Sequence, residues 1–146
     1  MAKKKPDHRD AELILKLYDL RREEVMRASR NAIVQWAPRS YEDVLALTQP
    51  SHPINVAWRQ VATYWEMAYG FARHGIVNAD LLAESGAEGL ILYAKVEPYL
   101  ARLRKEVSPT IMQNAEWMAR KSAVAKMRLG LIQKRLAATT TSAAKA

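Results

Sequence analysis

The chain has 146 residues, a formal net charge of +8 and no cysteine. This length is typical of one domain and is sufficient to bury a hydrophobic core. The lack of cysteine excludes disulfides, thiolate nucleophiles and cysteine-based metal sites, and it fits the cytoplasm as the expected location. No stretch approaches the roughly 18 apolar residues of a membrane span. The lysines near the amino terminus lead into Pro6 and Asp7, and not into the apolar run of a signal peptide.

Positive charge is concentrated at the carboxyl end of the chain. Residues 1–116 contain 16 Lys/Arg and 15 Asp/Glu, whereas residues 117–146 contain seven cations and no acid. Such asymmetry indicates an anionic partner. The candidate partner-binding residues are Arg120, Lys121, Lys126, Arg128, Lys134 and Arg135.

The first predicted helix spans residues 10–36 and is followed by Pro38, which ends it. Apolar residues recur there at i, i+4 and i+7, as expected for one buried face. They are Ile14, Tyr18, Val25, Ala28, Ala32 and Trp36. A second, thinner apolar line makes the helix two-sided, so we expect it to contact more than one neighbour.

The central part of the chain predicts a short helix and then a strongly apolar one. Ser40, with Asp43 three residues later, is typical of an N-cap, and the short helix should span residues 41–47. The next helix, over residues 53–74, is apolar on most of its circumference, so we expect it to be the central helix of the fold. Gly75 suits the left-handed position that ends a helix.

Two further segments follow the central helix. Asn78 should cap a short helix that Gly86 interrupts, and another helix should begin near Ala87. Pro98 lies inside this second helix, where it removes a hydrogen-bond donor and predicts a kink or break.

Ser108 and Pro109 are a strong start signal for the last helix, which should span residues 109–138. Residues 139–146 should form a disordered tail.

The sequence thus predicts an all-α fold, an irregular bundle of about five helices around the helix at residues 53–74. A single helical domain should span residues 10–138, after a flexible basic amino terminus at residues 1–9. It should carry a long basic carboxyl-terminal helix.

Two blocks of sequence carry a resemblance to known proteins: "LILKLYDLRREEVMRASRNAI" and "YWEMAYGFARHGIVNADLLAES". They resemble a group of small bacterial all-helical proteins classed as a domain of unknown function, over residues 10–107. The resemblance implies an α-helical fold and supplies no catalytic or binding residue. The basic carboxyl end lies outside it.

Glu66 is the strongest candidate for acid–base chemistry, because it is the one acid between Asp43 and Asp80. Arg59 and Arg73 lie seven residues away on either side. A partly buried Glu66 would have a perturbed pKa and a cavity beside it. The alternative is an ion-paired stripe on a solvated face. The sequence shows no nucleophile elbow or phosphate-binding loop, and we expect no enzyme activity, metal site or cofactor.

The predicted basic helix has two lines of residues. Lys121, Arg128 and Arg135 repeat every seven residues on one line. The other line is apolar and can pack on the body of the protein: Met118, Ala125, Leu129, Ile132 and Leu136.

Three partners could match the cations of this helix. One is a protein, including a second copy with acids such as Asp19, Glu23 and Glu24 opposite the cations. The others are nucleic-acid phosphates and an anionic membrane surface. The alternative is a solvated face whose Lys134 and Arg135 complement the helix dipole.

We therefore expect a non-enzymatic helical interaction or assembly module that binds a protein partner or forms a homo-oligomer. The alternative is a nucleic-acid-binding protein that uses the basic helix.

Overall fold

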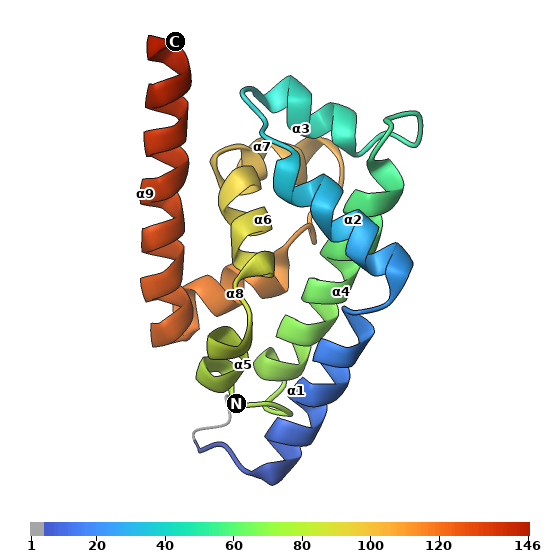
Figure 1. Cartoon of the computed structure of the whole chain (residues 1–146), viewed down its shortest axis with the longest axis vertical. Coiled ribbons are helices and arrows are strands. Elements are labelled where there is room, and N and C mark those ends of the chain that lie inside the picture. Colours follow the sequence, from blue (N-terminus) through green and yellow to red (C-terminus); the bar gives the residue numbers. More distant parts are fainter. Residues whose placement is uncertain (1–4) are drawn as a thin grey trace.

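The structure, a computed structural model, describes residues 5–146, and no strand occurs among them. Residues 1–4, part of the predicted flexible amino terminus at residues 1–9, lie outside the described residues. In chain order the elements are α1 (His8–Leu20), α2 (Glu24–Gln35), α3 (Tyr41–Leu47), α4 (Asn55–Arg73), α5 (Ala79–Ser85), α6 (Glu88–Val96), the 3-10 helix η1 (Glu97–Tyr99), α7 (Leu100–Glu106), α8 (Gln113–Lys121) and α9 (Ala123–Lys145) (Figure 1). The all-α class is confirmed, with more and shorter helices than the sequence predicts.

The helix predicted over residues 10–36 is in fact two helices. Residues 21–23 form a turn, and the side chain of Glu23 accepts two backbone N–H groups of α2 at 2.9 and 3.0 Å. An acid at this position also favours the positive end of the helix dipole. Because the turn changes the register, Tyr18 and Val25 do not lie on a shared buried face. They are 55% and 59% exposed.

The two helices predicted in the middle of the chain are confirmed. Ser40 and Asp43 form a capping box at the start of α3, and the amide of Asn55 donates to the carbonyl of Leu47 at its end, at 2.9 Å. Helix α4 buries nine residues and contacts α2, α5, α6 and α8. It is therefore the central helix expected over residues 53–74.

Both chain breakers after α4 act as predicted. Gly75 has a φ of 73°, and the Ile76 N–H donates to the carbonyl of Phe71 at 2.8 Å. This hydrogen bond is the one that defines a Schellman ending. Pro98 lies in η1, which interrupts the helical path between α6 and α7.

The start predicted for the last helix is wrong. Residues 108–112 form a turn in which Met112 has a left-handed φ of 54°, and α8 begins only at Gln113. The carboxylate of Glu66 on α4 accepts backbone N–H groups at the start of α8. The start of α8 is therefore accompanied by a contact with α4, a helix that is distant in the sequence. The local signal at Ser108 and Pro109 does not begin a helix.

The last helix is also not continuous. Ser122 has an extended ψ of 125°, and its hydroxyl accepts the N–H of Ala125 at 3.0 Å as the N-cap of α9. Helix α9 then runs to Lys145, through most of the segment at residues 139–146 for which the sequence predicts disorder. The predicted helix at residues 109–138 is thus replaced by two helices that differ in direction (Figure 1).

A buried lysine completes the end of α2. The Nζ of Lys95 on α6 donates to the carbonyls of Ile33, Val34 and Trp36 at 3.0, 2.8 and 2.7 Å. Carbonyls in the last turn of a helix lack intrahelical donors, so they accept from other groups. Burial lowers the pKa of Lys95. This side chain connects α6 to α2.

Candidate functional site

The structure divides the predicted partner-binding cations between two helices. They are Arg120 and Lys121 at the end of α8, and Lys126, Arg128, Lys134 and Arg135 on α9. Because Ser122 breaks the helix, Lys121 does not continue the line formed by Arg128 and Arg135.

Helix α9 is fixed to the bundle by its first half. It contacts α5, α6 and α8, and its buried residues are Ala125, Leu129 and Ile132, which belong to the predicted apolar line. At its start, the Ser122 hydroxyl donates to Asp80 of α5 at 2.6 Å. All residues after Leu136 are exposed. Figure 1 shows this end of α9 at the left, reaching past the neighbouring α6 and α7.

The side of α9 that faces away from the bundle combines apolar and cationic residues. At 3.6 residues per turn, Met127, Leu131 and Lys134 lie opposite the buried line, with cations on both flanks. Met127 is 57% exposed and Leu131 is 48% exposed. We call this surface the outer face of α9, and it comprises Lys126, Met127, Arg128, Leu131, Lys134 and Arg135.

The cations of the outer face have no carboxylate partner among the residues that the structure describes. Arg120 pairs with Glu116 at 2.9 Å, but within residues 5–146 no ion pair involves a cation of the outer face. The helix dipole does not explain Lys134 and Arg135, because its effect is confined to the last turn and α9 continues to Lys145. These charges are therefore not neutralised by an ion pair within residues 5–146.

Glu66 acts as a cap for α8. Its carboxylate accepts the N–H groups of Asn114 and Ala115 at 3.0 and 2.7 Å. Burial raises the pKa of Glu66, although these N–H groups and two nearby arginines oppose the increase. In the described chain no ion pair joins it to Arg59 or Arg73, so the predicted ion-paired stripe is absent. The carboxylate is partly buried, as the catalytic hypothesis requires, but α8 occupies both of its oxygens.

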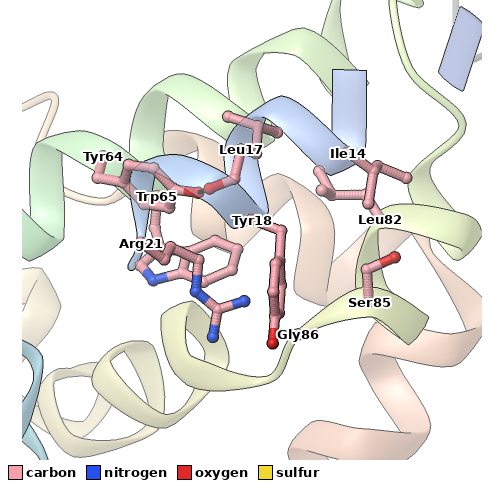
Figure 2. Close-up of a pocket in the computed structure, with 9 residues that line it drawn as sticks. All are labelled: Ile14, Leu17, Tyr18, Arg21, Tyr64, Trp65, Leu82, Ser85 and Gly86. Carbon is pink, nitrogen blue, oxygen red and sulfur yellow. Dashed lines mark hydrogen bonds between the residues drawn. The ribbon is translucent and has the colours of Figure 1, made fainter. Parts of the chain in front are cut away.

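A second polar cluster lies between α1, α4 and α5, at a cavity of about 20 Å³ (Figure 2). The guanidinium of Arg21 lies 5.3 Å from the ring centre of Trp65 and 5.6 Å from that of Tyr18, within cation–π range. The buried Glu88 accepts from Trp65 Nε1 at 3.0 Å and from Arg30 Nε at 2.6 Å. Because the cavity holds about one water molecule, we assign this cluster a structural role.

The histidines are dispersed over the structure. His8 begins α1, His52 accepts the N–H of Ile54 at 3.2 Å, and His74 follows the last residue of α4. Among residues 5–146, no group of three or more His, Cys, Asp or Glu side chains is placed to hold a metal ion. In the same range, no helix combines the length and the apolar character needed to cross a membrane.

The described residues form an all-helical bundle. Helix α9, which contains no carboxylate side chain, projects from it. The chain belongs to the family described as Domain of unknown function (DUF4760), whose match covers residues 6–122. This confirms the resemblance seen in the sequence and extends it through α8. Helix α9 lies outside the match. Comparisons with curated proteins and with solved structures found no match.

Proposed function

We propose that the protein is an interaction module whose outer face on α9 binds an acidic, partly apolar surface of a different protein. The observation that carries this proposal is the composition of the face. Exposed Met127 and Leu131 lie among cations that have no carboxylate partner in the described chain.

The apolar centre favours a protein partner over nucleic acid. Phosphate neutralisation needs only cations, and single-strand binding also uses aromatic side chains, which α9 lacks. Protein interfaces instead combine an apolar centre with a polar rim. Covering the exposed half of Leu131 should contribute about 1 kcal/mol, on the scale for burial of a whole leucine side chain.

A second copy of the chain is the weaker match for the same face. The expected acids Asp19, Glu23 and Glu24 lie beside Arg22 and Arg27, so the α1–α2 junction is not an acidic surface. Glu23 is also engaged as the N-cap of α2. Pairing of two α9 helices would bring cations together, which is unfavourable.

A defined probe tests the proposal. The probe is a fluorescent helical peptide with a leucine stripe flanked by glutamates, and its binding to the full chain is followed by anisotropy. Leu131→Ala should weaken binding about fivefold, which corresponds to about 1 kcal/mol. The double variant Lys134→Gln/Arg135→Gln should weaken it at least as much, and the difference should shrink as salt is added.

Matched controls lie on other surfaces of the molecule. Val56→Ala, at a side chain that is 69% exposed on α4, and the double variant Arg39→Gln/Arg59→Gln should leave the affinity unchanged. The proposal is wrong if a peptide with serine in place of leucine, a DNA duplex, or vesicles of anionic phospholipid bind as tightly as the probe. Concentration-dependent dimerisation that Leu131→Ala abolishes would instead assign the face to a second copy.

A further inference from the structure

A cleft of about 330 Å³ lies where η1 and α7 meet α8 and α9, away from the outer face. Its apolar wall includes Leu100 of α7 and Leu129 of α9, and Tyr93 of α6 also lines it. This volume is at the lower end of the range for small-molecule sites, which starts at about 300 Å³. The cleft is therefore large enough for a small organic molecule.

One side of the cleft carries an excess positive charge. Glu116 is shared by two arginines, with Arg104 Nη1 at 3.0 Å and Arg120 Nη2 at 2.9 Å. Arg104 is also fixed by its Nε, which donates to the carbonyl of Ile111 at 2.9 Å. Arg120 is 72% exposed, and no other hydrogen bond of its guanidinium occurs in the described chain. Two guanidinium groups and one carboxylate leave one positive charge, with free donors on Arg120.

A negative charge on the cleft lining lacks a charged partner. Glu97 of η1 accepts a hydrogen bond from the amide of Gln133 at 2.9 Å, and in the described chain it makes no ion pair. A neutral amide does not compensate the carboxylate. The cleft therefore presents one uncompensated cation and one uncompensated anion.

The Tyr93 hydroxyl lies within range of these charges. Burial raises the pKa of Tyr93, and the charges of Glu97 and Glu116 act in the same direction, while Arg120 and Arg104 oppose them. These four charged residues line the same cleft as Tyr93. Tyr93 is 4% exposed, and no hydrogen bond of its hydroxyl is present among the described residues. This hydroxyl is an additional donor or acceptor for a ligand.

We infer that the cleft binds a free α-amino acid with an apolar side chain. Arg120 would bind its carboxylate by charge-assisted hydrogen bonds, Glu97 would bind its ammonium group, and its side chain would lie against Leu100 and Leu129. This site does not depend on the outer face of α9, so it stands apart from the proposed function. Because the ligand would touch α7, α8 and α9, it would also hold α9 on the bundle.

The test is an NMR titration of the full chain with L-leucine, L-isoleucine, L-methionine and L-phenylalanine. At least one should shift the Nε–Hε signal of Arg120 and the backbone amides beside the cleft, in a saturable manner. The N-acetyl derivative lacks the ammonium group and the amide derivative lacks the carboxylate, so each should bind at least tenfold more weakly than the free amino acid. A charge-assisted hydrogen bond corresponds to about this factor.

Two substitutions in exposed residues locate the ligand. Arg120→Gln and Glu97→Gln should each weaken binding at least about tenfold. Lys121→Gln and Glu84→Gln make the same charge changes at exposed residues outside the cleft lining and should leave binding unchanged. Equal binding of the N-acetyl derivative would overturn the assignment in favour of a plain anion site. No saturable shift with any of the four amino acids, or equal loss with Lys121→Gln, would also overturn it.

Discussion

The substitution Ser122→Ala tests the break between α8 and α9. Ser122 is 2% exposed, and its hydroxyl makes two hydrogen bonds at the junction. It accepts the N–H of Ala125 at 3.0 Å and donates to the carboxylate of Asp80 at 2.6 Å. Alanine removes both contacts and leaves the Asp80 oxygen without this donor.

The expected loss follows from these two contacts. Removal of an N-cap serine costs about 1 kcal/mol. Loss of a partly buried hydrogen bond to a carboxylate costs about 1.5–3 kcal/mol. Since one hydroxyl serves both contacts, we expect the free energy of unfolding to fall by about 2–3 kcal/mol. In a continuous helix over residues 109–138 the same change would raise it by up to about 0.5 kcal/mol, because alanine is the better helix former.

Urea denaturation followed by circular dichroism measures the difference. Ser40→Ala is the matched control, because Ser40 caps α3 through a local capping box without a buried carboxylate from another helix. It should cost about 1 kcal/mol. A Ser122→Ala protein at least as stable as the wild type would refute the break at this residue.

Four further substitutions test the packing of two glycines, a buried tyrosine and a buried lysine. Gly89→Ala should destabilise the protein by about 2 kcal/mol, because its Cβ would meet the Tyr69 hydroxyl and lie 2.7 Å from the ring of Trp65. Gly130→Ala should stabilise the protein by about 0.5–1 kcal/mol, since nothing lies within 4 Å of the added carbon. If the urea midpoints of Gly89→Ala and Gly130→Ala moved in the same direction, this packing would be contradicted. Burial raises the pKa of Tyr64 to about 12. As pH rises, this hydroxyl therefore ionises in the unfolded chain before it ionises in the folded protein, so stability is lost above about pH 10. The wild type should lose roughly 2 kcal/mol more than Tyr64→Phe between about pH 9 and 12, and equal losses would contradict the buried hydroxyl. Lys95→Met removes the donor to three carbonyls and should cost roughly 2 kcal/mol. The exposed control Lys105→Met should change stability by less than about 0.5 kcal/mol, and similar effects of the two would contradict the cap on α2.

Helix ends that depend on neighbouring residues could be predicted from the sequence. Ser40 begins α3, Gly75 ends α4 and Pro98 interrupts the helical path after α6, each by chemistry contained within a few residues. Other ends involve side chains distant in the sequence. Glu66 caps α8 from 48 residues away, and Asp80 binds the Ser122 hydroxyl from 42 residues away. Such contacts leave no periodic signal in the sequence.

The candidate site could be predicted only in part, for the same reason. The excess of cations is a property of composition, and the apolar line through Leu129 and Ile132 follows from helical periodicity. Glu116 and Arg120 are spaced i,i+4 on α8. The sequence did not predict the cleft beside them, because its other lining residues come from separate helices. It also assigned Lys121 to the same line as Arg128, and the turn at Ser122 removes that alignment.

The most direct test of the central claim is to map the bound acidic, leucine-bearing peptide on the full chain by NMR. Backbone amides of residues 126–138 should shift on titration, and those of α4 near Val56 should not. The shifts should disappear when Leu131→Ala is combined with Lys134→Gln and Arg135→Gln. Shifts spread evenly over the exposed cations of the molecule, or confined to the bundle at residues 5–121, would contradict a partner-binding outer face on α9.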